Sequence, residues 1–375
     1  MTKRILYVQL LEPGAYPPIM NSAKLFVENN WRVKLISAPI RNKSLRIDSK
    51  NNFSEHRLFP RKSHVITKSY LFYYLVRTLL INFKFRPDYI YLSDPISSVP
   101  GFFLKLFFRV KLVYHEHDTP SNFSGSGQFL SIFRKWVLKN AELVIFPNEQ
   151  RAIKVQQMEK IDFKSLFIVW NVPLLSNCNQ YRYTPPKNDL WLYYHGSINT
   201  ERLPYELFQA IAKFNGKVKI KIVGYEAPGS IGYISKLEKL YNNNNKKKLI
   251  YYVGSINHED LHKHARDCHV GVCFMPSSSN DINMECMVGA SNKVFEYMSF
   301  GLPVLVSDKN EWVETFVNSG FGYSCDSSSS SRIYKQLETI IQSNNLEILS
   351  MKSHNQILSI WNYDNFFSKV IYKLK

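Results

Sequence analysis

The stretch SNKVFEYMSFGLPVLVSD, residues 291–308, has the pattern of a short helix followed by a buried strand. Ser291 and Asn292 can cap the start of the helix, and Gly301 can end it. Pro303 stops the helix before the apolar run Val-Leu-Val. A loop, a short helix, a glycine and a strand in this order predict one repeat of an open parallel α/β sheet.

Lys293 and Glu296 lie one helical turn apart at the start of that helix. In open α/β sheets, ligands bind beyond the carboxyl ends of the strands, where helix N-termini offer free backbone N–H groups to an anion. The Glu296 carboxylate could therefore reach a sugar hydroxyl while the helix end meets a phosphate. The alternative is a surface ion pair between the two side chains, worth about 0.2–0.5 kcal/mol.

Strand-like apolar runs alternate with helical patterns along the whole chain, which is the order of doubly wound parallel sheets. We therefore expect an α/β protein with two Rossmann-like domains. The polar segment 171–189, with three prolines, separates the two halves. The expected divisions are an N-terminal domain at 1–172, a linker at 173–188, a C-terminal domain at 189–358, and an aromatic C-terminal helix at 359–375 that packs back on the N-terminal domain.

The formal charge of +18 is concentrated in the first half of the chain. Residues 1–180 carry 26 Lys and Arg against 12 Asp and Glu, whereas residues 181–375 carry 22 against 18. Such a basic half fits nucleic acid, an anionic membrane surface or an acidic substrate. Because the chain has no stacked basic-aromatic motif of the nucleic-acid-binding kind, we expect no nucleic-acid partner.

Residues 69–86 and 102–111 mix bulky apolar and aromatic side chains with cations. Neither apolar run reaches the roughly 18 uninterrupted residues of a spanning helix. Amphipathic helices in the headgroup region of an anionic membrane fit this mixture, and core helices with snorkelling cations are the alternative. We expect a cytoplasmic protein held peripherally on the inner face of the cell membrane.

The five cysteines are an odd number without CxxC spacing, which is not the pattern of a disulfide framework or a zinc ribbon. They fit a reducing cytoplasm. The first apolar run ends in Glu12, Pro13 and Gly14 without a small-residue cleavage site, so we expect a first buried strand there and no signal peptide.

With these two halves and the stretch 291–308, the sequence resembles the GT-B glycosyltransferases, in particular glycosyltransferase family 4, the glycosyl transferases group 1. The resemblance implies an N-terminal acceptor-binding domain and a C-terminal nucleotide-sugar-binding domain that face each other across a cleft. In this family the glutamate of the FEYM-type helix binds the donor's ribose hydroxyls, which implies that role for Glu296. Many relatives have a second glutamate eight residues earlier, where this chain has Val288, and Glu285 lies close but out of register.

A second match is HGSINTERLP, residues 195–204. Relatives often have Gly-Arg there, with a lysine five residues beyond the arginine, and the two cations bind the diphosphate. Here Gly196 matches, Ser197 replaces the arginine, and Arg202 stands at the lysine position. The resemblance implies diphosphate binding by Arg202, with Lys293 in place of the missing cation. A solvated loop residue is the alternative for Arg202.

Two further segments belong to the same expected donor site. Asn292 precedes Lys293 in the Asn-Lys form of the helix motif. Residues 251–261, which include Gly254 and Ser255, resemble the loop that lines the nucleobase mostly through its backbone.

The third match is KLVYHEHDTP, residues 111–120, at the end of a first-domain strand. It aligns His117 and Asp118 with a family pair whose histidine lies beside the transferred sugar. Two alternatives come from the residues themselves. His115 and His117 would point to the same side of a strand and could bind a metal together with Asp118, or His117 could be a neutral structural histidine.

The resemblance to family 4 implies retention of anomeric configuration, with the donor phosphate assisting the acceptor. An inverting enzyme would instead need a base on the first-domain side, and Glu12, Asp94 and Asp118 are the candidates beyond strand ends. Gly14 lies in the turn that relatives place near acceptor and phosphate, although a turn without a ligand is the alternative. No Asp-x-Asp occurs in the chain, so we expect neither a metal nor another cofactor.

The sequence therefore predicts a nucleotide-sugar-dependent glycosyltransferase, of the hexosyltransferase type, that acts on a lipid-linked or cell-surface glycan acceptor. Synthesis of lipopolysaccharide or capsule would be its setting. A nucleotide-sugar 2-epimerase has the same architecture and is the first alternative. An inactive basic scaffold that binds membrane or nucleic acid is the second, and it predicts no dependence on Glu296. The sugar, the nucleotide, the acceptor and the oligomeric state do not follow from the sequence.

Overall fold

The structure is a computed structural model of the chain, divided into two compact units. Unit 1 comprises Met1–Asn171, Asp281–Ala290 and Tyr363–Lys375, and unit 2 comprises Val172–Asn280 and Ser291–Asn362. The structure describes residues 2–10, 16–38, 52–59, 67–120, 126–178, 181, 183–186, 189–242, 247–276 and 278–375, without the side chains of 126–128.

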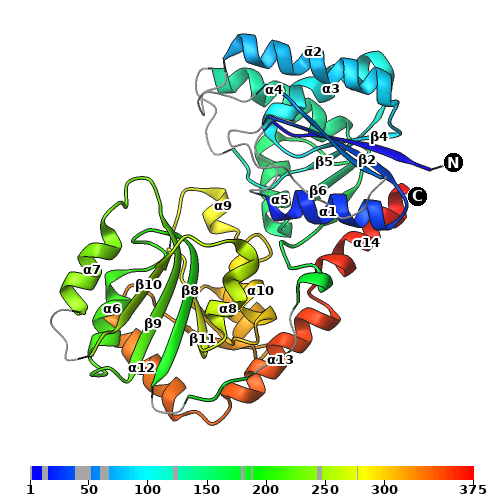
Figure 1. The fold of residues 1–375 in the computed structure, drawn as a ribbon. Helices are drawn as coiled ribbons and strands as arrows, with labels where there is room; N and C mark the ends of the chain where they lie inside the picture. Colours follow the sequence, from blue (N-terminus) through cyan, green and yellow to red (C-terminus); the bar gives the residue numbers. More distant parts are fainter. Residues whose placement is uncertain are drawn as a thin grey trace. The chain divides into compact units, whose positions relative to one another are not determined.

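Unit 1 is built on a seven-stranded parallel sheet in the order β3-β2-β1-β4-β5-β6-β7 (Figure 1). The strands β4 and β6 are buried along their whole length, as continuous apolar runs are when helices cover both faces of a parallel sheet. The strand order reverses between β1 and β4, which marks the usual place for a ligand. The strands are β1 (Arg4–Val8), β2 (Arg32–Ser37), β3 (Phe53–Arg57), β4 (Tyr89–Leu92), β5 (Lys111–His115), β6 (Leu143–Phe146) and β7 (Leu166–Ile168).

The helices of unit 1 connect these strands, and two come from the second half of the chain. They are α1 (Pro17–Glu28), α2 (Lys68–Phe85), the 3₁₀ helix η2 (Pro95–Ser97), α3 (Ser98–Phe108), α4 (Ser126–Asn140), α5 (Glu149–Glu159), α9 (Ile282–Glu285) and α14 (Tyr363–Leu374).

Unit 2 is built on a six-stranded parallel sheet in the order β10-β9-β8-β11-β12-β13, which reverses between β8 and β11. Its strands are β8 (Leu190–Ile198), β9 (Val218–Glu226), β10 (Ile250–Gly254), β11 (Val270–Cys273), β12 (Val304–Ser307) and β13 (Gly322–Cys325). Its helices are η3 (Leu175–Asn177), α6 (Tyr205–Ala212), α7 (Tyr233–Tyr241), η4 (His258–Asp260), α8 (Leu261–Ala265), α10 (Asn292–Ser299), α11 (Asn310–Trp312), the π-helical turn η5 (Val313–Val317), α12 (Ser330–Gln342) and α13 (Leu346–Ser359).

The predicted fold class of two Rossmann-like α/β domains is confirmed, and the stretch 291–308 folds as predicted. Ser291 occupies the N-cap position of α10, although its side chain makes no capping hydrogen bond. Gly301 has a φ of +77°, a conformation that favours glycine and ends the helix. The strand β12 then begins directly after Pro303.

The segment Asp281–Ala290 departs from the expected continuous C-terminal domain at 189–358, because it packs in unit 1. The Asn283 side chain and the Thr119 backbone exchange two hydrogen bonds, of 2.8 and 2.7 Å. Arg151 donates to the carbonyl of Cys286 at 2.9 Å, and Asn148 donates to that of Val288 at 2.6 Å. We call this segment the strap. It places Val288, the position of the missing second glutamate, in unit 1.

The C-terminal helix packs on the N-terminal part of the chain as predicted, but it begins at Tyr363 rather than at 359. The Tyr363 hydroxyl donates to the carbonyl of Pro18 at 3.0 Å, and the rings of Phe367 and Phe26 lie 5.4 Å apart. Residues 359–362 belong to unit 2, where α13 ends at Ser359. Unit 2 begins at Val172, so much of the expected linker 173–188 is part of that unit.

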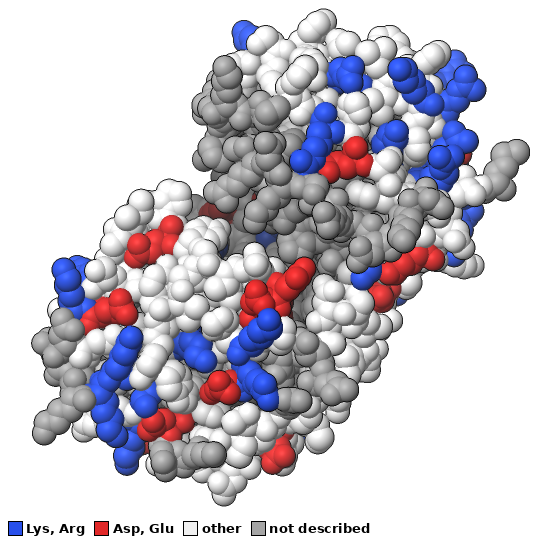
Figure 2. All heavy atoms as spheres, viewed as in Figure 1, with Lys and Arg blue, Asp and Glu red and all other residues white. Residues whose placement is uncertain are grey.

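Exposed apolar side chains gather on the neighbouring helices α2, α3 and α4 of unit 1. Phe72 and Phe83 on α2, Phe107 on α3 and Ile132 on α4 are each more than half exposed. Figure 2 shows Lys and Arg side chains over much of unit 1, with few acidic side chains among them. Among the described residues, no helix combines the length and the apolar character that crossing a membrane requires.

A buried ion pair holds α4 to the loop after β5. Arg134 donates to both carboxylate oxygens of Glu116, at 2.6 and 2.7 Å, and to Glu159 at 2.8 Å. The Arg134 and Glu116 side chains are almost completely buried. Thr119 adds a third donor to Glu116 at 2.7 Å. This network fixes the loop that carries the next two residues, His117 and Asp118.

Replacing one partner of this pair should be costly. We expect Arg134→Met to lower the free energy of unfolding by about 3–5 kcal/mol, because it leaves the Glu116 carboxylate buried without its counter-charge. Lys135→Met is the matched control, since Lys135 is half-exposed and 4.0 Å from Glu159, and it should change stability by less than about 1 kcal/mol. Urea denaturation followed by circular dichroism measures both. Equal effects of the two substitutions would contradict this role of Arg134.

Candidate active site

The end of β8 and the start of α10 meet through a glycine. Gly196 has a φ of +117°, which side chains other than glycine rarely adopt. A Cβ at this position would lie 2.6 Å from Cε of Lys293, so the glycine also leaves room for the lysine chain. The backbone N–H of His195 donates to the hydroxyl of Tyr297 on α10 at 3.1 Å. These contacts bring the predicted pair Gly196 and Lys293 together.

Two cations lie close together at this point, and the nearest carboxylate that acts on Lys293, that of Glu296, is not at ion-pair distance. Lys293 is buried, and its pKa is lowered to about 8 by burial and by the nearby charge of Arg202. The Arg202 guanidinium donates to Oγ of Ser197, and its Nε is buried without a hydrogen-bond partner. In the part of the chain that the structure describes, no carboxylate lies within ion-pair distance of either cation. Such a pair is a site for a bound anion.

The buried Glu296 carboxylate lies one turn further along α10 and is surrounded by donors. Its Oε1 accepts from Nδ2 of Asn292 at 2.8 Å and lies 3.0 Å from Nε2 of His258. Its Oε2 lies 2.7 Å from Nε2 of His195. Burial by itself raises the pKa of Glu296, but the contacts of the two histidines outweigh it and hold the pKa well below its ordinary value. Glu296 is therefore an ionised acceptor at neutral pH.

The ends of β9 and β10 complete this edge of the sheet. Gly224 on β9 approaches the carbonyl of Gly196 so closely that a Cβ there would collide with it. Gly254 ends β10 with a φ of +86°, and Oγ of Ser255 donates to the carbonyl of Gly224 at 3.4 Å. The predicted residues of the nucleobase loop therefore lie beside the predicted diphosphate residues, in one unit.

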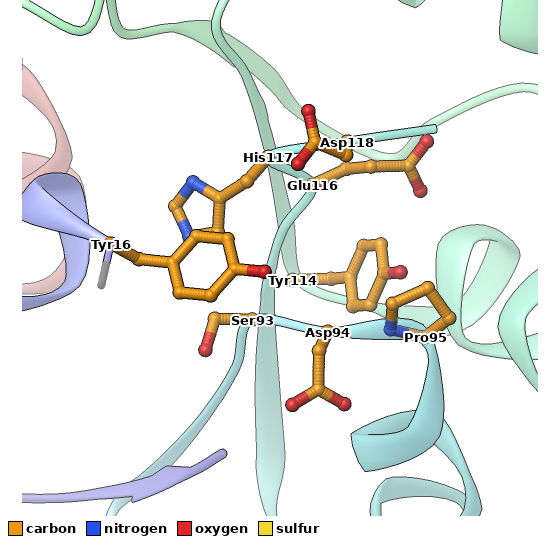
Figure 3. A pocket seen from close by; sticks show the side chains of 8 residues that line it. All are labelled: Tyr16, Ser93, Asp94, Pro95, Tyr114, Glu116, His117 and Asp118. Carbon is orange, nitrogen blue, oxygen red and sulfur yellow. The ribbon is translucent and has the colours of Figure 1, made fainter. Parts of the chain in front are cut away.

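Unit 1 has a separate polar cavity of about 50 Å³ at the carboxyl ends of β4 and β5 (Figure 3). The ring of Tyr16 reaches in beside His117, with ring centres 5.8 Å apart. Burial, and then the charges of Asp118 and Asp94, raise the pKa of Tyr16 to about 12, so its hydroxyl keeps its proton. The lining residues are Tyr16, Ser93, Asp94, Pro95, Tyr114, Glu116, His117 and Asp118.

His117 is buried in this wall with neither ring nitrogen in a hydrogen bond. Burial, and then the charge of Arg151, lower its pKa to about 3, so the imidazole is neutral at physiological pH. Arg151 also donates to the carbonyl of His117 at 2.7 Å and thereby fixes the loop. A neutral imidazole without a partner can donate to or accept from a hydroxyl group of a ligand.

The two carboxylates beside His117 differ in their surroundings. Asp94 accepts from the backbone N–H groups of Leu10 at 2.8 Å and Ser97 at 2.6 Å, so it caps η2 and joins β1 to β4. This gives Asp94 a structural role. Burial raises the pKa of Asp118, although the charge of Arg151 opposes the rise. Among the residues that the structure describes, Asp118 is not tied into the strand ends in this way, and it lies beside His117 in the cavity wall.

The remaining predicted residues have no role in either site that the structure shows, or fall outside the described residues. Glu12 and Gly14 fall outside the described residues. Glu285 lies on the strap and pairs with Lys154 at 2.6 Å. His115 packs against His117 and bonds to the hydroxyl of Tyr91 at 2.6 Å. Within the described ranges, no three His, Cys, Asp or Glu side chains form a group that could hold a metal ion.

Sequence reasoning missed three residues of these sites, His195, His258 and Tyr16. His195 directly precedes the predicted Gly196, and its place on β8 was the signal available for it. His258 lies in the nucleobase loop, whose side chains received no role. Tyr16 lies two residues beyond Gly14, in the turn predicted to be near the acceptor.

Comparisons with known proteins show which family and which folds the chain is similar to. Residues 180–355 match the family described as glycosyl transferases group 1. Similar solved structures include a sucrose-phosphate synthase from Thermosynechococcus elongatus (15% identity, TM-score 0.71, 99% of each chain covered) and Anabaena Alr3699/HepE in complex with UDP and glucose (14%, 0.70, 100% of this chain and 99% of that chain). A UDP-N-acetylglucosamine 2-epimerase is also similar (15%, 0.63, 100% of this chain and 96% of that chain). No curated protein matches the chain.

The buried His117 predicts loss of stability in acid. Its pKa is about 3 when folded against 6.5 ordinarily, so between these values the unfolded chain takes up a proton that the folded chain does not. At pH 5 this lowers the free energy of unfolding by about 2 kcal/mol relative to neutral pH. In His117→Asn the fall between pH 7.5 and pH 5 should be smaller by that amount.

Hydrogen exchange of the β5 and β6 amides measures this stability within unit 1. Ser93→Ala is the control, because it alters the same cavity without removing a titrating group, and its pH dependence should match that of the wild type. An unchanged pH dependence in His117→Asn would contradict the burial of a neutral imidazole.

Proposed function

The protein is a glycosyltransferase of the GT-B fold whose residues 180–355 form a glycosyl transferases group 1 domain, and we propose that its donor is a nucleoside-diphosphate sugar bound by unit 2. The observation that carries the proposal is the pair Lys293 and Arg202, two cations with no carboxylate at ion-pair distance, one turn from the ionised Glu296. A diphosphate would supply the missing negative charge, and a ribose diol would supply donors to the carboxylate.

Transfer requires that the bond between the sugar and the diphosphate break as the acceptor oxygen bonds to the anomeric carbon. Lys293, Arg202 and the backbone N–H groups at the start of α10 would stabilise the negative charge on the leaving diphosphate. In a retaining reaction, the acceptor's proton passes to a phosphate oxygen of the donor. We propose this metal-independent course, with the neutral His117 of unit 1 bonding to the transferred sugar and Asp118 beside it.

For the acceptor we propose a lipid-linked or cell-surface glycan that is reached at an anionic membrane. The exposed aromatic and aliphatic side chains of α2, α3 and α4 support this, since they sit among cations on the unit that carries most of the excess charge. Amphipathic helices of this composition bind in the headgroup region. Peripheral attachment at the cytoplasmic face of the cell membrane, in lipopolysaccharide or capsule synthesis, follows from the same proposal.

An epimerase on the same fold is the second candidate, and its product distinguishes it. A glycosyltransferase yields a glycosylated acceptor and one nucleoside diphosphate for each sugar transferred. A 2-epimerase inverts the sugar at C2 and glycosylates no acceptor. Lys293 and Arg202 could bind the diphosphate of the donor in either reaction. Only an assay of the products therefore distinguishes the two candidates.

Nucleotide binding tests the donor site. At 100 times its dissociation constant, the matching nucleotide among UDP, GDP, ADP, dTDP and CMP should stabilise the wild type by about 2.7 kcal/mol, which is a shift of a few degrees in Tm. Glu296→Ala should lose the shift because the ribose contact is gone. Gly196→Ala should also lose it, because the new Cβ displaces Lys293.

Differential scanning fluorimetry measures these shifts, with Glu314→Ala as control, since Glu314 is an exposed glutamate of unit 2 away from the site. The control should shift as the wild type does. Absence of a shift with all five nucleotides, or equal shifts in Glu296→Ala, would favour the inactive scaffold.

Vesicle binding tests the membrane surface. The protein should co-sediment with vesicles of phosphatidylglycerol and phosphatidylcholine but not with phosphatidylcholine alone, and less at 0.5 M salt, because screening weakens the attraction. The triple variant Phe72→Ser, Phe83→Ser, Phe107→Ser should bind at least about tenfold more weakly. Its control is Ile231→Ser, Ile348→Ser, Met351→Ser, at exposed apolar positions of unit 2. Equal losses in both variants would contradict a specific membrane surface on α2 and α3.

A further inference from the structure

Both oxygens of the Glu296 carboxylate have a protein group nearby in the absence of a ligand, but only Oε1 accepts hydrogen bonds. Asn292 and His258 lie at Oε1, and His195 lies at Oε2. His195 and Asn292 come from β8 and α10, and the side chain of His195 is only 5% exposed. These two residues contact Glu296 from the interior of unit 2, and each is part of a strand or a helix.

His258 is the outer contact and differs from the other two. It lies on the three-residue helix η4, four residues beyond Gly254, and its side chain is 59% exposed. The backbone of this helix is joined to the sheet by a loop rather than by strand pairing, as residues 255–257 are not in a strand. Of the three groups on Glu296, His258 is thus the one that can leave without disturbing the core.

A vicinal diol needs the carboxylate oxygens that His258 partly occupies. Because Oε2 is buried, a hydroxyl group that donates to Glu296 would have to reach Oε1, where the His258 ring nitrogen lies 3.0 Å away. We propose that His258 is a positioning residue of the donor site. It holds Glu296 in place while the site is empty, and the ribose of the donor displaces it from Glu296. Protonation of His258 therefore opposes nucleotide binding. This inference rests on the proposed nucleotide-sugar function of unit 2.

The charges around His258 set the direction of the pH effect. Glu296 faces it from α10, Glu259 lies beside it on η4, and His195 faces it from β8. The hydrogen bond with Glu296 raises the pKa of His258, burial opposes this, and the charge of Glu259 adds to the rise. Release from Glu296 removes the main cause of the raised pKa, so nucleotide binding should release a proton. Affinity should then fall as the pH is lowered through the pKa of His258.

Isothermal titration with UDP at pH 6.0 and pH 8.0, in buffers of different ionisation enthalpy, measures affinity and proton release together. At pH 6.0, His258→Asn should bind UDP roughly three- to tenfold more tightly than the wild type and release fewer protons. At pH 8.0 the two should differ less. Because the phosphate groups of UDP titrate equally with both proteins, the difference between them isolates His258.

Two variants complete the experiment. His262→Asn removes a nearby histidine that bonds to the carbonyl of Glu259 instead of Glu296, and it should bind as the wild type does at both pH values. His195→Asn should bind more weakly at both, because it releases the inner side of Glu296. If His258→Asn binds UDP no more tightly than wild type at pH 6.0, with an unchanged proton release, the inference is wrong while the donor site stands. If UDP, GDP, ADP, dTDP and CMP all fail to bind every variant, the donor site itself is wrong, and this inference with it.

Discussion

The Arg151 guanidinium joins backbone carbonyls from two distant parts of the chain, and the arrangement of unit 1 depends on it. It donates to His117 in the loop after β5, and to Asn283 and Cys286 in the strap, at 2.7, 3.2 and 2.9 Å. A buried guanidinium requires such acceptors, since its positive charge is costly to remove from water. The guanidinium that binds the strap therefore also holds the backbone of the predicted sugar-binding loop. Together with burial, which is the larger cause, its charge lowers the pKa of the His117 imidazole.

The candidate sites of the two units differ in charge. Unit 2 presents cations without an anion and a carboxylate held by histidines, which suits a ligand that carries both phosphate and hydroxyl groups. Unit 1 presents the neutral His117 and the protonated Tyr16 in a small cavity that carboxylates also line, which suits a ligand with hydroxyl groups. In each unit the residues lie where the strand order reverses, because the helices diverge there and leave the strand ends open.

Much of this was predictable because it is encoded locally. The alternation of apolar runs predicts both sheets, and the short motifs around Gly196 and Glu296 predict the residues that meet in unit 2. The strap was not predictable, since its contacts with Arg151 and Asn148 span more than 130 residues and leave no periodic pattern. His195 and His258 were missed for a related reason. Each acts on Glu296 from another element, and only the packing of β8, η4 and α10 brings them to one carboxylate.

The strap and α14 also bear on how such a protein can be rearranged during evolution. The chain passes between the two units four times, after residues 171, 280, 290 and 362. A recombination that joined residues 1–171 to the remainder of a relative would combine one parent's sheet with the other parent's strap and last helix. The surface around Arg151 from one parent and the strap from the other parent would then have to fit each other. Exchange of the whole nucleotide-sugar-binding part is thereby restricted to parents that share this surface, although each unit has its own sheet and core.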